Sequence, residues 1–504
     1  MAQSQIKYGA LISYATIFFN IVAGLLYTPW MIRQIGTADY GLYSLVTAVI
    51  SYFLIDFGLG SVIGTYVAKF RAQQNFHKVN LIIGISYKAY IIITVCITLG
   101  LFICYFFLAD IFKELTDAEI IKFKTIYCIG GFFSICNFPF TPVNGILIAY
   151  ERFIALKLAD LIQRVLCIIL IICCLLSGYG LYTLVFVNGA IGLSISLLKF
   201  IYVKFNIGIN INIKETDKTI FREIASFSGW AFIVGVAQRF TINIVPSILG
   251  IVSGTTQIAI FSFASTLEGY VWTLASGLNG LFIPRVSKDV AQNRTPLEIT
   301  NLMIKVGRIQ LYITGLLISC IIIFGATFIK LWIGPDFHNS YIIAVLIIFP
   351  NIIILTEEIA NTLLWVKNEL KYRAILFICA GIISSSMGII LGSKFGAVGP
   401  GIGIFVALVL CHCLGLNIVY QKVLHLDIFR FFKMCHFKIL PIMMIPGIIF
   451  FFAIRCFDQM QWKGLIMTGI FYLFCEGVIL YKWAMNDTEK ELIKSLIHTK
   501  KTKA

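Results

Sequence analysis

The amino-acid sequence predicts an all-α polytopic membrane protein with fourteen transmembrane helices. Of its 504 residues, 59% are hydrophobic and only 13% are charged, and the mean hydropathy is +0.92. A soluble protein carries charge at about a quarter of its positions, so most of this chain must face lipid or other membrane helices. The apolar runs do not show the alternation that marks a membrane barrel, which favours helices.

The number of spans follows from the apolar runs, since about 20 residues are enough to cross a bilayer as a helix. The first run lacks a small-x-small cleavage site, so we expect a retained helix rather than a signal peptide. The runs fall near residues 8–32, 40–68, 79–108, 121–149, 158–178, 181–203, 224–250, 256–284, 302–332, 340–366, 373–393, 396–421, 437–456 and 462–483.

The basic residues indicate how these spans are oriented. The net charge is +16, which in a soluble protein would suggest nucleic acid, but Lys and Arg gather in every second short loop. Cytoplasmic loops carry such an excess, so both termini are predicted to be cytoplasmic and no nucleic-acid partner is expected. The longest cytoplasmic loops, at about 20 residues, are too short for a catalytic domain. We therefore do not expect an enzyme.

An internal repeat divides the chain. The stretch "FGLGSVIGTYVAK" at 57–69 aligns with "SGLNGLFIPRVSK" at 276–288, at a constant offset of about 219 residues. Six spans in each repeat predict two lobes with the same membrane orientation, which is an arrangement for alternating access. We predict an N-terminal six-helix lobe at 1–205, a C-terminal six-helix lobe at 206–425, and helices 13 and 14 with a basic cytoplasmic tail at 426–504.

Charged side chains within the predicted spans are candidate functional residues, because charge is costly at membrane depth. Arg239 lies more than halfway along the span 224–250, and Gln238 precedes it. The planar guanidinium of Arg239 offers paired donors that suit phosphate. Asp160 and Arg164 are four residues apart, on one helical face, and are able to pair. A purely structural role remains an alternative for each of these charges.

Asp56 interrupts the second span, within "LIDFGLGS" at 54–61. The aligned position of the second repeat is Ala275, so the shared helix does not require a carboxylate there. Asp56 is either the counter-ion of a buried arginine, a cation-coupling residue, or part of a structural pair. The remaining charges predicted at membrane depth are Lys88, Glu268, Glu357, Glu358 and Glu476. Lys88 and Glu357 could instead reach the membrane surface or bind between helices.

The 14 cysteines lie mostly in apolar runs, where cysteine behaves as a small hydrophobic residue. We therefore predict no disulfide framework. The stretch "CHC" at 411–413 lacks partner ligands and falls inside a predicted span, so no metal site is expected. Nothing else in the sequence indicates a cofactor.

Several short stretches resemble the polysaccharide-exporter branch of the multidrug/oligosaccharidyl-lipid/polysaccharide superfamily, which contains the O-antigen and capsule repeat-unit flippases. The elements that carry the resemblance are Gly9, Pro29, "IGTADYGLYS" at 35–44, "DFGLGS" at 56–61 and "YVAK" at 66–69. The resemblance is strongest over about the first 70 residues.

The resemblance implies a flippase that moves an oligosaccharide on a lipid carrier of the undecaprenyl pyrophosphate type from the cytoplasmic to the periplasmic leaflet of a bacterial inner membrane. Membrane lipids would surround it, and a polysaccharide polymerase could act as a partner. Cations in a central cavity can offset the diphosphate charge; the candidates are Arg239, Arg164 and Lys88, with Gln238 beside them. The family's use of ion gradients implies H⁺ or Na⁺ coupling, for which the candidates are Asp56, Glu268, Asp160 and Glu357.

Helices 13 and 14 resemble those that form a lipid-tail groove in the related peptidoglycan-precursor flippase. The first span carries no charge before Arg33, unlike the arginine-rich first helix of that relative, which argues against that branch. Two alternatives stay open. The first is a cation-coupled multidrug exporter of the same superfamily, a class that usually has twelve spans and acidic cavities. The second is a membrane-embedded glycosyltransferase or polymerase, a class that generally has a large periplasmic loop.

Overall fold

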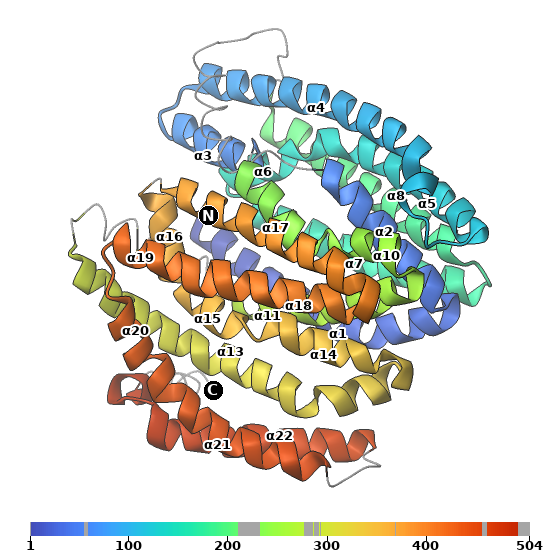
Figure 1. Cartoon of the computed structure of the whole chain (residues 1–504). Helices are drawn as coiled ribbons and strands as arrows, with labels where there is room; N and C mark the ends of the chain where they lie inside the picture. Colours follow the sequence, from blue (N-terminus) through green and yellow to red (C-terminus); the bar gives the residue numbers. More distant parts are fainter. Residues whose placement is uncertain are drawn as a thin grey trace, which may run out of the picture. The chain divides into compact units, whose positions relative to one another are not determined.

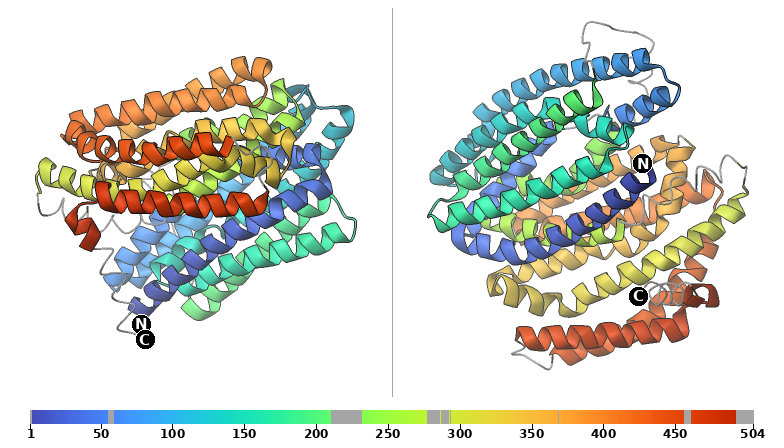
Figure 2. Two further views of the ribbon diagram at one scale, coloured as in Figure 1. Left: turned by 90° about the horizontal axis from the view of Figure 1, so that it is seen from below. Right: turned by 180° about the vertical axis from the view of Figure 1, so that it is seen from behind.

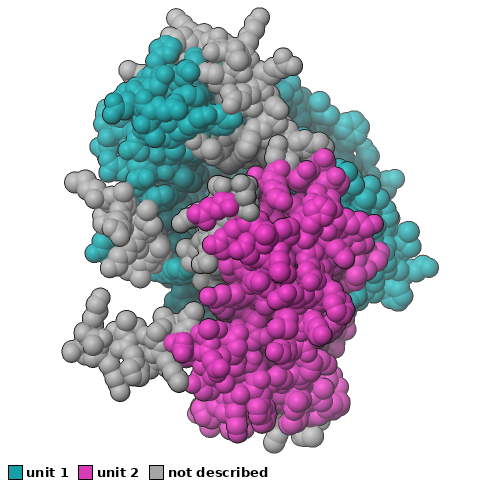
Figure 3. Space-filling model, turned by 90° about the vertical axis from the view of Figure 1, so that its left-hand side faces the viewer, with its two compact units in different colours: residues 1–263, 373–407 teal, residues 264–372, 408–504 magenta. Residues whose placement is uncertain are grey.

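The computed structural model describes residues 2–54, 59–209, 232–276, 286, 292, 294–367, 369–455 and 461–491. Every regular element within these ranges is a helix (Figure 1). The chain divides into two compact units, which are coloured separately in Figure 3. Unit 1 is Met1–Phe263 with Arg373–Ala407, and unit 2 is Ala264–Tyr372 with Leu408–Ala504.

Unit 1 contains the helices of the first half of the chain. Within it, α1 lies along α7 (Figure 2), α3 packs on α6, and α5 packs on α8. Its helices are α1 (Ala2–Ile35), α2 (Thr37–Phe53), α3 (Leu59–Ala72), α4 (Phe76–Ile111), α5 (Asp117–Asn137), η1 (Phe138–Phe140), α6 (Pro142–Ala149), α7 (Phe153–Leu176), α8 (Leu181–Tyr202), η2 (Val203–Ile207), the helix Phe232–Ile242, α10 (Val245–Val252), the first residues of α11 (Thr255–Ser276), nearly all of α17 (Leu370–Phe395), and α18 (Val398–Ala407).

Unit 2 contains the rest of α11 and most of the second half of the chain. Its last two long helices, α21 and α22, pack against each other and against α13 (Figure 1). The helices are α13 (Pro296–Trp332), η4 (Pro335–Phe337), α14 (His338–Ile348), α15 (Asn351–Ile354), η5 (Leu355–Glu357), α16 (Glu358–Val366), η6 (Leu408–Leu416), α19 (Asn417–Lys422), α20 (Ile428–Met434), α21 (His436–Arg455), α22 (Trp462–Ile479) and η7 (Leu480–Ala484).

Twelve helical segments of the described ranges are long and apolar enough to cross a membrane. The pair Phe232–Ile242 and Val245–Val252 makes a thirteenth if it is one span, bent by 41°. These thirteen overlap thirteen of the predicted runs. The remaining run, 40–68, includes the undescribed residues 55–58, so a fourteenth span stays a prediction. The lobe boundaries at 205 and 425 also stay predictions.

The surface of the long helices is apolar, which confirms a polytopic membrane protein. A water-soluble monomer rarely exposes a continuous apolar face, whereas α4 presents one along most of its length, formed by Ile92, Val95, Leu99, Phe102, Ile103 and Phe106.

Local sequence explains where two of the long helices begin. Thr116 caps α5 and Thr295 caps α13, and each forms a reciprocal capping box with the glutamate three residues later. Such a box satisfies amide groups that the first helical turn leaves unpaired. The first turn of α5 also contacts another helix, because Glu119 Oε1 accepts a hydrogen bond of 2.7 Å from the hydroxyl of Thr255 at the start of α11.

The same end of α11 lies against α2. A Cβ atom at Gly41 would lie only 2.2 Å from the carbonyl oxygen of Thr255, so this position has room for hydrogen alone. The Lys122 ammonium of α5 donates to Asp39 of α2 at 2.8 Å. We call the contact formed by Gly41, Glu119 and Thr255 the α2–α5–α11 junction.

A buried ion pair joins α13 to the segment after η7. The Arg308 guanidinium binds both carboxylate oxygens of Glu489, at 2.6 and 2.9 Å, and also donates to the carbonyls of Met434 and Ala484, at 2.8 Å each. The Tyr312 hydroxyl donates to Glu489 at 3.0 Å. We call these five residues the C-terminal latch. It fixes the end of the last two helices to α13.

Candidate functional site

Arg239, the cation that the sequence analysis favoured most, caps the C-terminal end of α2. Its guanidinium donates to the carbonyl of Ser51 and, at 3.4 Å, to that of Leu54. The last carbonyls of a helix have no partner within the helix, and Arg239 supplies one. The side chain is half-buried, while Gln238 is exposed.

Further bonds hold the helix Phe232–Ile242 and α10 against α2. The Tyr52 hydroxyl donates to the carbonyl of Asn243 at 2.8 Å and lies 2.9 Å from the hydroxyl of Ser247. The rings of Tyr52 and Phe240 stack with centroids 6.3 Å apart. These bonds fix the position of Arg239 relative to the end of α2. Asp56 lies two residues beyond Leu54 in the sequence, outside the described residues.

The predicted pairing of Asp160 with Arg164 is wrong. Asp160 instead accepts a hydrogen bond of 2.7 Å from Lys199 of α8, which also donates to Asn144 at 3.2 Å. Lys199 is only 9% exposed, and a buried ammonium is much more costly to leave unpaired than an exposed guanidinium. Asp160 is thus the counter-ion of Lys199, and Arg164 is exposed on α7. Lys88 is exposed on α4.

The carboxylates of Glu268 and Glu357, both in unit 2, are each held by an asparagine. The Asn417 amide donates to Glu357 at 2.6 Å, and the Asn351 amide donates to Glu268 at 3.2 Å. Glu357 is only 2% exposed. Neither carboxylate forms an ion pair with a described residue. Each is therefore a site where a bound proton or a cation can neutralise the negative charge.

These carboxylates lie beside an interruption in the span Pro335–Val366. Pro350 has no N–H to continue the helix, and the chain passes through α15 and the 3₁₀ turn η5 before α16 begins. On the neighbouring span, η6 is a π-helix. Helix irregularities of this kind occur often at functional sites, and in membranes they need buried polar partners. We call the group Glu268, Asn351, Glu357 and Asn417 the carboxylate–asparagine site.

His436 extends this polar region. Its Nε2 lies 3.2 Å from the hydroxyl of Thr356, and the residue is 2% exposed. The sequence analysis missed His436, as well as Asn351, Asn417 and Lys199. The signal for the asparagines was present, because each is a polar residue inside a predicted apolar run.

The described residues contain no cluster of three or more His, Cys, Asp or Glu side chains that could hold a metal ion. Cys411, His412 and Cys413 are buried in η6. Cys413 donates weakly to the carbonyl of Pro350 at 3.8 Å, an oxygen that also accepts from the amides of Ile353 and Ile354.

The multiple apolar spans, with buried polar groups between them, define a polytopic membrane protein. The chain belongs to the family described as "Polysaccharide biosynthesis protein", whose model matches residues 7–290. The family resemblance found in the sequence is thereby confirmed.

The chain is similar in sequence to two bacterial membrane proteins. The chain is 28% identical over 157 residues to the "Putative O-antigen transporter" of Escherichia coli (strain K12), a match that covers 31% of this chain and only 37% of that protein. It is 20% identical over 493 residues to the "Uncharacterized membrane protein EpsK" of Bacillus subtilis (strain 168), covering 92% and 93% of the two chains.

The fold is also shared with solved structures. The lipid II flippase MurJ in an inward closed conformation superposes with a TM-score of 0.70 at 14% identity, covering 94% of this chain and 99% of that one. An inward-facing multidrug resistance MATE family transporter of the MOP superfamily gives 0.65 at 14% identity, covering 82% and 98%. At this identity the likeness shows the fold alone.

Proposed function

We propose that the chain is a flippase that moves oligosaccharide repeat units on a polyprenyl pyrophosphate carrier from the cytoplasmic to the outer leaflet of a bacterial inner membrane, by ion-coupled alternating access between two six-helix lobes. Both termini are then cytoplasmic, and a polysaccharide polymerase consumes the product. The family match supports the substrate class. The observation that carries the mechanism is the carboxylate–asparagine site, where two carboxylates at membrane depth lack a cationic partner among the described residues.

The coupling argument starts from the cost of burying charge. An ionised carboxylate without a cation costs several kcal/mol in an apolar interior. Glu357, at 2% exposure, is therefore most stable with a bound proton or Na⁺. Loss of that ion leaves an unstable charge, and a conformation that rehydrates the carboxylate gains in population. Alternation between the two states couples the ion gradient to movement of the substrate.

The cationic candidates serve the other half of the cycle. Arg239 has five N–H donors, and its hydrogen bonds to the carbonyls of Ser51 and Leu54 leave donors for an anion. Arg164 and Lys88 are exposed at the depth of the predicted spans. A diphosphate is a strong acceptor for such groups, so we assign Arg239, Arg164 and Lys88 to the pyrophosphate.

Replacing Glu357 with glutamine tests the coupling. Glutamine keeps the size and the oxygen that accepts from Asn417, so we expect normal protein level and thermal stability. Transport should lose its response to pH and Na⁺ and fall at least tenfold. The measurement is ion-dependent flipping of a lipid-linked oligosaccharide in proteoliposomes. Glu369→Gln, at a partly exposed loop position, is the matched control. Retained ion dependence in both Glu357→Gln and Glu268→Gln would remove these residues from the coupling mechanism.

Replacing Arg239 with lysine tests the binding of the pyrophosphate. Lysine keeps the charge but cannot form the paired bonds of a guanidinium, so export of surface polysaccharide should fall several-fold at unchanged protein level. Arg33→Lys, at the exposed end of α1, is the matched control and should export normally. Wild-type export by both Arg239→Lys and Arg239→Met, at wild-type protein level, would exclude Arg239.

A multidrug exporter is the second candidate function, because the carboxylate–asparagine site could accept a cationic drug as well as an ion. The comparison that favours it is the fold shared with the MATE family transporter. Drug resistance that depends on Glu357 and not on Arg239, together with unchanged surface polysaccharide, would favour the exporter over the flippase.

A further inference from the structure

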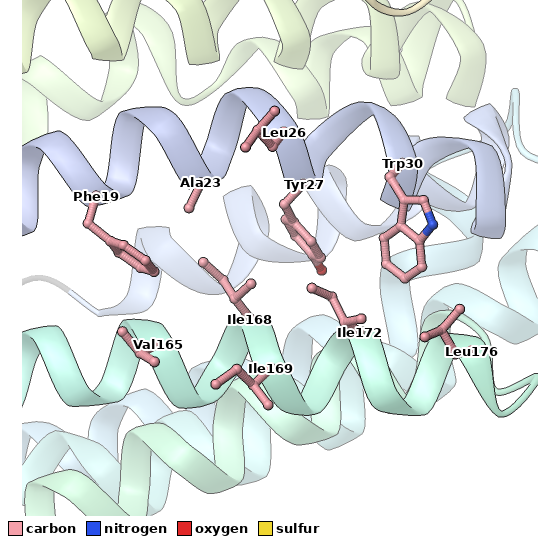
Figure 4. Close-up of a pocket in the computed structure, with 10 residues that line it drawn as sticks. All are labelled: Phe19, Ala23, Leu26, Tyr27, Trp30, Val165, Ile168, Ile169, Ile172 and Leu176. Carbon is pink, nitrogen blue, oxygen red and sulfur yellow. The ribbon is translucent and has the colours of Figure 1, made fainter.

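A groove lies between α1 and α7, entirely within unit 1 (Figure 4). Its volume is about 520 Å³, within the usual range for a ligand site. The part of α1 that lines it runs from Phe19 to Trp30, about 17 Å at the rise of an α-helix. The lining residues belong to two membrane spans, within Phe19–Trp30 of α1 and Val165–Leu176 of α7.

The groove contains one buried polar atom. The hydroxyl of Tyr27 points from α1 toward α7, between Ile168 and Ile172 (Figure 4), and has no hydrogen-bond partner among the described residues. A buried hydroxyl without a partner is unfavourable, because nothing replaces the hydrogen bonds that it would make to water. A ligand that brings an acceptor into the groove would remove that cost.

A cation lies at one end of the same groove. Arg164 precedes Val165 and continues the row Ile168, Ile172 and Leu176 at four-residue spacing, and residues so spaced share one helical face. Arg164 is exposed and forms no ion pair with a described residue. Its charge acts electrostatically on Tyr27 across the groove. The face therefore combines an apolar wall with a guanidinium at its N-terminal end.

The two parts of this face select different parts of a ligand. Lipid tails are as apolar as the lining side chains, so the wall by itself gives little preference for one lipid over another. An unpaired arginine at membrane depth is costly and requires an anion. A phosphate is the anion for which a guanidinium has the best geometry.

We propose that the α1–α7 groove binds the isoprenoid chain of a polyprenyl phosphate carrier, with its phosphate on Arg164 and within reach of the Tyr27 hydroxyl. This rests on the proposed function, and it assigns the lipid chain of the substrate to a definite place. The groove between two helices fits the one long chain of a polyprenyl phosphate better than the paired tails of an ordinary phospholipid.

The test measures lipid binding to the purified full-length chain by native mass spectrometry. The probe is undecaprenyl phosphate, with phosphatidic acid and inorganic phosphate as separate competitors. Ala23→Phe fills the groove, and Arg164→Gln removes the cation. Each is expected to weaken binding of undecaprenyl phosphate at least tenfold, while phosphatidic acid and inorganic phosphate compete poorly against the wild type.

Matched controls separate the groove from a general effect of the substitutions. Val22→Phe places the same ring at the preceding position of α1, outside the lining, and Arg152→Gln removes an exposed arginine before α7. Both should bind undecaprenyl phosphate as the wild type does. Ala23→Leu, a smaller filling change, replaces Ala23→Phe if that variant does not fold.

Equal binding by the wild type, Ala23→Leu and Arg164→Gln would overturn the assignment, and so would displacement by phosphatidic acid at equal concentration. Export of surface polysaccharide by the same variants gives the independent measurement. If the wild type exports polysaccharide but the groove variants bind undecaprenyl phosphate as well as the wild type does, the groove assignment alone is wrong. If the groove variants lose binding but the wild type exports no polysaccharide, the flippase function is contradicted.

Discussion

Glu489→Ala is expected to lower the free energy of unfolding of unit 2 by about 3–5 kcal/mol, the usual cost of removing one partner from a buried ion pair. Arg308 and Glu489 are only 6% and 10% exposed, and the bonds between them are bidentate. The substitution leaves a guanidinium at α13 without its counter-charge. The measurement is chemical unfolding in detergent, followed by a probe placed on α22.

Two further variants separate the loss of the buried charge from the loss of a side chain in general. Glu489→Gln keeps an acceptor and should lose less stability than Glu489→Ala. Glu369→Ala breaks an ion pair with Lys371 whose side chains are 33% and 50% exposed, and exposed pairs contribute little, so no measurable loss is expected. Equal stability of Glu489→Ala and the wild type would show that the latch does not hold the last two helices.

The latch also predicts a dependence on pH. Burial by itself would raise the pKa of Glu489, but the hydrogen bonds from Arg308 and from the Asn486 amide, with the charge of Arg308, outweigh it and hold the pKa below the ordinary 4.5. A carboxylate with a lowered folded-state pKa contributes stability above its unfolded-state pKa and loses it as the pH falls through the folded-state value. Wild-type unit 2 should therefore weaken below pH 4.5 more steeply than Glu489→Gln.

Gly41→Ala is expected to destabilise unit 1 by about 1–3 kcal/mol, the usual cost of overpacking. The added methyl would lie 2.2 Å from the backbone oxygen of Thr255, and a backbone atom cannot turn away as a side chain can. The start of α11 must move, which strains the hydrogen bond from Thr255 to Glu119. The measurement is thermal unfolding in detergent, together with cysteine accessibility at position 255 in a Thr255→Cys background.

Gly269→Ala is the control for Gly41→Ala, because nothing lies within 4 Å of a Cβ at Gly269. Alanine inside a helix is favoured over glycine by about 0.5–1 kcal/mol, so this variant should be slightly more stable. The same chemical change thus has opposite signs at the two positions. A stable Gly41→Ala variant with wild-type accessibility at position 255 would show that the α2–α5–α11 junction is not tightly packed.

The spans were predictable because bilayer thickness fixes the length of an apolar run. The predicted run 158–178 corresponds to the helix Phe153–Leu176, and the predicted run 302–332 corresponds to the helix Pro296–Trp332. The extra turns at the N-terminal ends contain capping and charged residues, which hydropathy scores as loop. The bend between Phe232–Ile242 and α10 lies near Pro246, at the start of α10.

The partners of the charges were not predictable from spacing. Asp160 and Arg164 satisfy the i, i+4 rule. The actual partner of Asp160, Lys199, lies 39 positions away in sequence and is more deeply buried than Arg164. In the same way, Glu357 meets Asn417 across 60 positions. Sequence patterns report on one helix at a time, whereas the choice of counter-ion depends on which neighbouring helix buries its own polar group most deeply.

The length of α13 bears on where the C-terminal latch lies. The helix has 37 residues, about 56 Å at 1.5 Å per residue, which is nearly twice the thickness of a hydrocarbon core of about 30 Å. The stretch Arg308–Trp332, about 37 Å long, is sufficient by itself to cross that core. We therefore expect Arg308 to lie near the depth of the lipid head groups. Hydrophobic mismatch acts on such a position directly, so a thicker bilayer draws the buried ion pair toward the hydrocarbon and makes the attachment of α21 and α22 dependent on lipid composition.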